Sequence, residues 1–322
     1  MKIVSLFSGA GGLDLGFKKA GYNIIWANDN NPSLNTTYTS NHPETIYCSR
    51  DIRRLSYTDV PDCDGIIGGP PCQSWSVAGN QKGLEDDRGK MFLEFIRLIN
   101  EKQPLFFVAE NVKGILLPKH QTAYDYIMNK FADSGYNTST YLLNARDYNV
   151  PQNRERVFFI GFKKDTFLSF QIPPKHLPPK NLRQAIGDLE DSAIPAVRKY
   201  FTNGDKCVVP NHEYLDIPFP FDYGNYNRVK PWEDQSYTIR ATGKYALPHP
   251  LCPKMQLNQY KKYSFPKDIQ EKCRRLTVRE CARIQTFPDQ FVFHYQNLMD
   301  GYSMVGNAVP VNLSYNVARC IE

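Results

Sequence analysis

Short apolar runs that alternate with amphipathic stretches constrain the first half of this chain most strongly. The runs lie at 2–7, 24–27, 65–67 and 105–109, each bounded by Gly, Pro, Asn or Asp, as expected of buried strands. Apolar residues recur at helical spacing over 89–103, and a second helix is expected over about 121–133. Strands that alternate with helices predict an α/β domain with a largely parallel, Rossmann-like sheet.

The composition changes after residue 173. Prolines and tyrosines crowd the stretch to about 266, which predicts irregular β structure and loops. Just before it, runs at 141–143 and 156–162 are expected to pair as an antiparallel hairpin. Thr277 and Glu280 are spaced as a helix capping box, and a last helix is expected over 310–320.

The positive charge of the chain is concentrated in this second stretch. Residues 174–296 hold 19 basic and 13 acidic side chains, a net charge of +6, whereas the remaining residues hold 20 of each and sum to zero. Basic residues interleaved with tyrosines suit a polyanion such as DNA or RNA, although a solvated basic surface is the commoner reason for such an excess.

Composition excludes several classes of protein. With 41% hydrophobic and 22% charged residues over 322 positions, one large or two moderate globular domains are expected. No apolar run is long enough to cross a bilayer, and the start does not read as a signal peptide, so we expect a cytoplasmic protein. The eight cysteines form no C-x-x-C pair and show no zinc-ligand spacing. This pattern predicts mostly free thiols and supports neither a metal site nor a disulfide framework.

A glycine-rich turn follows the first expected strand and opens a helix. Such a turn lets backbone N–H groups approach a ligand closely. Asp14 stands where a dinucleotide fingerprint requires glycine, which favours a nucleoside without phosphates. Asp29, after the second strand, is placed for ribose hydroxyls, and Asp51 with Ile52 for adenine. We infer S-adenosylmethionine as the ligand, with turn-capping aspartates as an equally common alternative. The loop residues expected to contact it are Phe7, Ser8, Gly9, Gly11, Gly12 and Leu13.

Cys72 ends a second turn, after Gly68-Gly69-Pro70-Pro71. The two prolines fix the backbone that presents the thiol. A thiolate is a strong nucleophile when neighbouring donors or cations lower its pKa. The alternative is an inert buried cysteine, which is the usual case for a single one.

Taken in order, the motifs resemble those of the DNA (cytosine-5-)-methyltransferase family. Residues 7–12 are similar to its cofactor loop and residues 70–73 to its nucleophile motif. Residues 109–112, 151–156, 275–288 and 306–310 match its later motifs in order across nearly the whole chain. The resemblance implies an S-adenosylmethionine-dependent methyltransferase sheet formed by 1–173 plus 300–322. It also implies a smaller, irregular β-rich target-recognition domain at 174–299.

The chemistry of that family gives the matching residues their roles. Addition of the Cys72 thiolate to C6 of a flipped cytosine makes C5 nucleophilic, and protonated Glu110 stabilises the charge that builds toward N3. Arg154 and Arg156, expected on one face of a strand, would hold the cytosine O2 or the phosphate. Taken singly, Glu110 fits a helix cap and the arginines fit an ion pair with Glu155.

The resemblance also extends the cofactor and DNA sites. By resemblance, residues 76–89 form a loop that closes over DNA, and residues around 210–214, 227–232 and 247–250 are similar to bacterial enzymes that methylate the inner cytosine of GGCC. Those enzymes protect DNA from a partner restriction endonuclease, and a related G+C-rich site is the alternative. Further cofactor contacts are expected from Pro70, Asn307 and Val309. The residues expected to read guanine edges, or to contact phosphate alone, are Arg228, Arg240 and Lys244.

Other functions remain open at this point. A tRNA cytosine-5 methyltransferase would share the chemistry, but that branch usually has a shorter variable region than the stretch between 156 and 275. A non-catalytic DNA-binding protein would not need Cys72 together with Glu110 and Arg154, and Asp14 disfavours a nicotinamide oxidoreductase. We expect a monomer, because one protomer can hold both cofactor and base.

Overall fold

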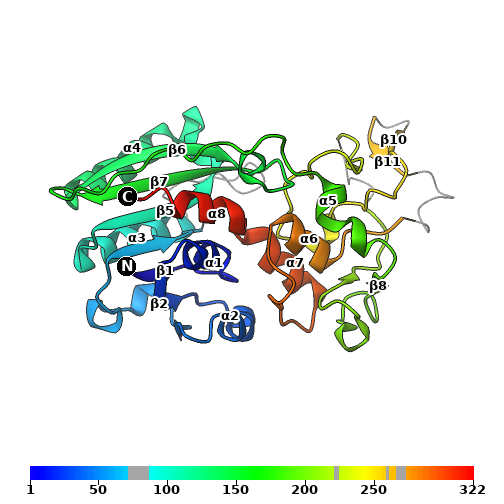
Figure 1. Ribbon diagram of the computed structural model, residues 1–322, viewed down its shortest axis with the longest axis horizontal. Coiled ribbons are helices and arrows are strands. Elements are labelled where there is room, and N and C mark those ends of the chain that lie inside the picture. The colour runs from blue at the N-terminus through cyan, green and yellow to red at the C-terminus, as the bar shows by residue number, and fades with distance from the viewer. Residues whose placement is uncertain (72–86, 221–224, 259–260, 266–272) are drawn as a thin grey trace. The chain divides into compact units, whose positions relative to one another are not determined.

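A computed structural model gives the fold (Figure 1) and describes residues 1–71, 87–220, 225–258, 261–265 and 273–322. These residues form two compact units. The first unit consists of Met1–Asn144, Glu155–Lys175 and Leu313–Glu322, and the second unit of Ala145–Arg154 and His176–Asn312. The functional division into catalytic and target-recognition domains remains a prediction.

A seven-stranded sheet forms the centre of the first unit. Its strands run in the order β3-β2-β1-β4-β5-β7-β6. The first five are parallel to one another, whereas β7 is antiparallel to both β5 and β6. The predicted α/β sheet and its antiparallel hairpin are therefore confirmed. The bounds are β1 Lys2–Leu6, β2 Asn23–Asn28, β3 Ile46–Cys48, β4 Gly65–Gly68, β5 Phe106–Val112, β6 Tyr136–Asn144 and β7 Glu155–Lys163.

Helices cover both faces of this sheet because successive strand residues point to opposite sides. Val4, Leu6 and Phe107 join a core with α3 and α4, in which Phe107 stacks on Phe131 at 4.3 Å between ring centroids. On the other face, α1 and α8 lie together (Figure 1), and the Ser314 hydroxyl donates to the Leu13 carbonyl at 2.6 Å. The bounds are α1 Gly12–Lys19, α2 Asn35–Asn41, α3 Asp87–Lys102, α4 Gln121–Asp133 and α8 Val311–Ala318.

The second unit has little regular structure, as its proline-rich sequence predicts. Its described residues form two small sheets, β8 with β9 and β10 with β11. The capping box is confirmed at α6: the Thr277 hydroxyl accepts from the Glu280 N–H at 3.0 Å, and the Glu280 carboxylate accepts from the Thr277 N–H at 2.8 Å. The bounds are α5 Leu182–Ile186, β8 Ile194–Pro195, β9 Glu213–Tyr214, β10 Gln256–Leu257, β11 Tyr263–Ser264, α6 Val278–Ile284 and α7 Leu298–Asn307.

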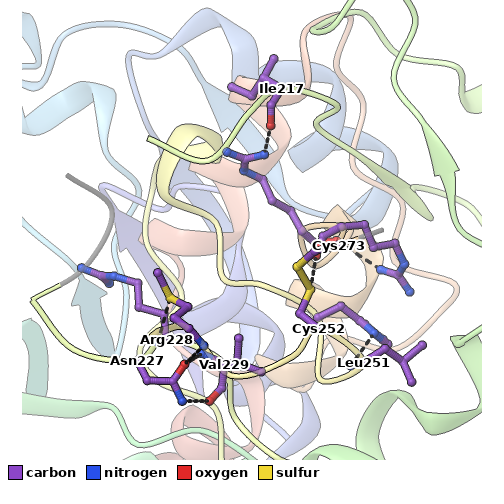
Figure 2. The surroundings of a disulfide bond; sticks show 11 residues. Ile217, Asn227, Arg228, Val229, Leu251, Cys252 and Cys273 are labelled. Atoms are coloured by element: carbon purple, nitrogen blue, oxygen red, sulfur yellow. Dashed lines mark hydrogen bonds between the residues drawn. A yellow bond between two sulfur atoms is a disulfide. The ribbon is translucent and has the colours of Figure 1, made fainter. Parts of the chain in front are cut away.

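A disulfide bond joins Cys252 to Cys273 in the second unit (Figure 2), with the two Cα atoms 5.0 Å apart. The prediction that the chain supports no disulfide is wrong at this pair. The two cysteines are 21 residues apart in sequence, and the antiparallel pairing of β10 with β11 between them turns the chain back. Because strand pairing brings the two cysteines together, their spacing in the sequence does not reveal the bond. The other described cysteines, Cys48, Cys63, Cys207, Cys281 and Cys320, are free thiols.

Among the residues that the structure describes, no helix is long and apolar enough to span a membrane.

Candidate active site

The glycine loop of the first unit turns sharply between β1 and α1. Phe7, Gly9 and Gly11 all have positive φ, at +53°, +58° and +88°. A Cβ atom on Gly11 would lie 2.3 Å from Nε2 of His42, so the position accepts only glycine without a shift of that ring. Inside the loop, the Gly11 N–H donates to the Ser8 carbonyl at 2.9 Å.

Asp29 holds this loop from the end of β2. Its carboxylate accepts hydrogen bonds from the backbone N–H of Gly9 and of Asn31, both at 3.0 Å. Burial raises the pKa of Asp29 above its usual value. Asp51 instead caps a short turn after β3, and its hydrogen bonds with Arg53 lower its pKa. The following Ile52 is buried.

Two features of the loop fit a small polar ligand. The Ser8 hydroxyl is buried and has no hydrogen-bond partner among the described residues. A Cβ atom on Gly9 would meet nothing within 4 Å, so the backbone there borders open space. A nucleoside with hydroxyl and amino groups would satisfy such a hydroxyl, so the donor set fits the expected cofactor. Gly12 and Leu13 are buried at the start of α1, and Pro70 is buried after β4.

Asn307 and Val309 belong to the second unit. Asn307 ends α7, and its side-chain amide donates to the Ser303 hydroxyl at 3.3 Å. Val309 is buried in the short link before α8. Their assignment to the cofactor stays a prediction.

Glu110 and Arg156 form an ion pair between adjacent strands. Glu110 lies in β5 and Arg156 in β7, diagonally across the antiparallel ladder. The Glu110 carboxylate is 2.8 Å from the Arg156 guanidinium, and the two side chains are 10% and 12% exposed. Glu155, offered above as a partner for the arginines, pairs instead with Lys113 at 3.0 Å. Because Glu110 lies inside a strand, it does not cap a helix.

The chain that leads to the predicted nucleophile passes directly beside Glu110. A Cβ atom on Gly69 would lie 3.4 Å from a Glu110 carboxylate oxygen. The Asn111 side-chain amide donates to the Pro70 carbonyl at 3.3 Å, a contact that the sequence motif does not reveal. Cys72 itself, and the loop expected over 76–89 up to residue 86, lie outside the described residues.

Arg154 is placed differently from the prediction. It precedes β7, which begins at Glu155, so it does not share a strand face with Arg156. Arg154 is 1% exposed, and its guanidinium donates to the backbone carbonyls of Ile239, Gly306 and Ala308 within the second unit. These hydrogen bonds hold the Arg154 side chain inside the second unit. A catalytic role for Arg154 stays a prediction.

The three residues predicted to read DNA lie in the second unit. Arg240 and Lys244 are exposed, and both cations lie over the Tyr245 ring, at 5.9 and 5.5 Å. Arg228 is buried, with its guanidinium 4.8 Å from the Tyr226 ring centroid. Figure 2 shows Arg228 in the surroundings of the disulfide, where its N–H donates to the sulfur of Met255.

Comparison with known proteins identifies the family of the chain. A family profile described as C-5 cytosine-specific DNA methylase matches residues 1–322. The Type II methyltransferase M.FnuDI of Fusobacterium nucleatum is 48% identical over 325 residues, covering 100% of this chain and 94% of that protein. M.MthTI of Methanothermobacter thermautotrophicus is also 48% identical, covering 100% and 97%. A solved structure described as a prophage-encoded DNA modification methyltransferase (E. coli) has a TM-score of 0.73 at 25% identity, covering 99% and 97%. The chain therefore belongs to the C-5 cytosine-specific DNA methylase family and is a type II cytosine-C5 DNA methyltransferase.

Proposed function

We propose that this enzyme methylates the inner cytosine of GGCC in double-stranded DNA, on a base flipped out of the duplex. In this proposal it acts as a cytoplasmic monomer and protects DNA from a cognate restriction endonuclease. The basic, tyrosine-rich second unit supports a DNA-binding role. Flipping is required because C6 of a stacked cytosine is out of reach of a protein nucleophile.

The cofactor in this proposal is S-adenosylmethionine, which supplies an electrophilic methyl group when bound. Backbone groups of the glycine loop and the Ser8 hydroxyl would hold the nucleoside. Asp29 would accept from the ribose hydroxyls. The other residues assigned to this site are Phe7, Gly9, Gly11, Gly12, Leu13, Asp51, Ile52, Pro70, Asn307 and Val309.

The residues of the chain activate the base. The Cys72 thiolate forms a bond to C6, the C5–C6 π pair shifts to C4–C5, and the C4–N3 π pair moves onto N3. The resulting enamine gives C5 carbanion character. Glu110 delivers a proton to N3 and stabilises that charge. An ion pair favours the carboxylate form, so Glu110 has to take up a proton as the base enters. After C5 has taken the methyl group, a base, for which water is the candidate, removes the C5 proton. The C5–C6 double bond then re-forms as the thiolate leaves, and the N3 proton returns to Glu110.

One observation carries this mechanism. A buried carboxylate, fixed by Arg156 at 2.8 Å, lies beside the Gly69-Pro70 segment that leads into Cys72. A general acid that works next to a nucleophile is expected to be a buried carboxyl group held by a charged partner close to that nucleophile. We expect Arg156 to orient Glu110, and the role proposed for Arg154 is to hold the cytosine O2 or the phosphate.

Bisulfite sequencing of plasmid DNA from cells that express the protein tests the proposal. We expect protected cytosines at one position of one G+C-containing site, with GGCC the expected site, and none in cells that express Cys72→Ala. Methylation at another site would contradict the specificity alone. Unmodified DNA together with methylated tRNA would contradict the choice of substrate.

A further inference from the structure

A buried carboxyl group closes the base of the glycine loop. Asp14 is fully buried on the first turn of α1, and its carboxylate accepts hydrogen bonds from the Ser5 hydroxyl at 2.7 Å and the Tyr38 hydroxyl at 2.6 Å. Ser5 lies two residues before Phe7, and Asp14 lies two residues after Gly12. The Ser5–Asp14 bond therefore ties together the two ends of the loop.

The second partner of Asp14 connects it to the centre of the loop. The Tyr38 ring stacks on the His42 ring at 4.5 Å between centroids. His42 in turn fills the space beside Gly11, where a Cβ atom would lie 2.3 Å from Nε2. Ser5, Asp14, Tyr38 and His42 thus form a continuous set, here called the loop clamp, that fixes both ends and the middle of the loop.

We propose that Asp14 is a positioning residue of the cofactor site. Through the loop clamp it holds the glycine loop, and it releases a proton when a nucleoside that carries a sulfonium cation binds there. This inference rests on the proposed cofactor.

The electrostatics of the cluster support proton release. Complete burial raises the pKa of Asp14 to about 6, against the opposing hydrogen bonds from Tyr38 and Ser5 and the charge of Lys18. A cation that approaches the loop favours the ionised carboxylate through a medium that screens poorly. The serine and tyrosine hydroxyls can accept as well as donate hydrogen bonds, so they can hydrogen-bond to both the protonated and the ionised carboxyl group.

The neighbouring titratable groups do not compete near neutral pH. Burial lowers the pKa of His42 to about 3, so its ring stays neutral. Burial and the charge of Asp14 hold the pKa of Tyr38 well above its usual value, and burial with the charge of Asp29 raises that of Tyr47. Lys18 on α1 is paired at the surface with Glu44. Within this cluster, Asp14 is the group that changes charge near pH 6.

Calorimetry near pH 6, in two buffers of different ionisation enthalpy, measures the protons released on binding. The wild-type enzyme should release protons on binding S-adenosylmethionine and far fewer on binding S-adenosylhomocysteine, which lacks the positive charge at sulfur. In Asp14→Asn the release should disappear. Its affinity for S-adenosylmethionine should fall roughly tenfold, and more than its affinity for S-adenosylhomocysteine.

Two further variants separate positioning from general damage. Tyr38→Phe removes a hydrogen bond that stabilises the ionised form, so proton release should persist with its midpoint at higher pH. Asp133→Asn, on an exposed carboxylate at the end of α4, should behave as wild type. Circular dichroism confirms that each variant is folded.

The outcomes are distinct. Unchanged proton release in Asp14→Asn, or equal losses for both ligands, would overturn the inference while leaving the cofactor assignment intact. Failure of the wild-type enzyme to bind either ligand would overturn the proposed cofactor.

Discussion

At the scale of single residues, strand pairing determines where the proposed general acid lies. The antiparallel ladder of β5 and β7 brings Arg156 to Glu110, and the end of β4 places Gly69 against the same carboxylate. The motif around Glu110 predicts the residue but not its partner, because Arg156 is 46 positions away in sequence and only the strand register joins the two. Sequence reasoning likewise missed Tyr38 and His42, which no motif marks.

Glu110→Gln should lower turnover by roughly 10²- to 10⁴-fold, because the amide cannot deliver a proton to N3. DNA affinity should change far less, since the variant keeps the shape of the side chain. Single-turnover methylation and a DNA-binding titration measure the two effects. Glu155→Gln, on the exposed carboxylate that pairs with Lys113, is the matched control and should retain turnover. Parallel losses of turnover and binding in Glu110→Gln would instead indicate a structural role.

Asp14 should make stability depend on pH. Its pKa rises from 3.8 to about 6 on folding, so the folded state binds the proton more tightly than the unfolded state. The resulting stabilisation is complete below pH 3.8 and is lost as the pH rises through about 6. Relative to Asp14→Asn, the wild-type free energy of unfolding should therefore fall by about 2 kcal/mol between pH 4 and pH 7. Urea unfolding across this range measures the difference, and a pH-independent difference would contradict the burial argument.

At the scale of elements, local patterns predicted structure best where the signal repeats along the chain. Bounded apolar runs correctly predicted the strands at 2–7 and 65–67, and helical spacing correctly predicted the helix at 89–103, within a few residues; the helix expected at 121–133 is also confirmed. In the second unit the elements are only two residues to ten residues long, and the disulfide depends on their pairing. Such contacts leave little periodic signal in the sequence.

The Cys252–Cys273 bond should stabilise the segment that surrounds Arg228. Val229, Cys252 and Met255 share one hydrophobic cluster, and Asn227 accepts from the Met255 N–H at 3.1 Å. The two cysteines are 21 residues apart in sequence. In the chain-entropy account, loss of their disulfide should lower the free energy of unfolding by about 3 kcal/mol. We expect the Cys252→Ser and Cys273→Ser double variant to melt at lower temperature and bind DNA less tightly than the oxidised wild-type enzyme. Cys207→Ser, on a free thiol, is the control. Unchanged DNA affinity in the double variant would show that the bond does not support recognition.

At the scale of the whole molecule, charge is divided unevenly along the chain. The +6 excess falls within 174–296 and the remainder is neutral. An excess concentrated in this way should make DNA binding strongly dependent on salt, because phosphate contacts release counterions. The salt dependence of DNA affinity, compared between variant and wild-type enzyme, also distinguishes base reading from phosphate contact by the exposed cations.

Lys244→Gln distinguishes base reading from phosphate contact. If Lys244 reads guanine, the variant should lose roughly 1–3 kcal/mol of discrimination between GGCC and a mismatched duplex. If it contacts phosphate alone, all duplexes should bind more weakly and the slope of log affinity against log salt should shrink by about 1. Fluorescence anisotropy at several salt concentrations measures both quantities. We expect loss of discrimination, and a uniform weakening would remove Lys244 from the recognition set.

Covalent trapping on 5-fluorocytosine tests the central claim most directly. Fluorine at C5 cannot leave as a proton does, so an enzyme that adds a thiolate to C6 should remain attached to the duplex after methyl transfer. With S-adenosylmethionine and a GGCC duplex that carries 5-fluorocytosine at the inner position, we predict a denaturation-resistant adduct that peptide mapping assigns to Cys72. Cys72→Ala should form none. Absence of an adduct with any G+C-containing duplex, or attachment at another residue, would contradict the account.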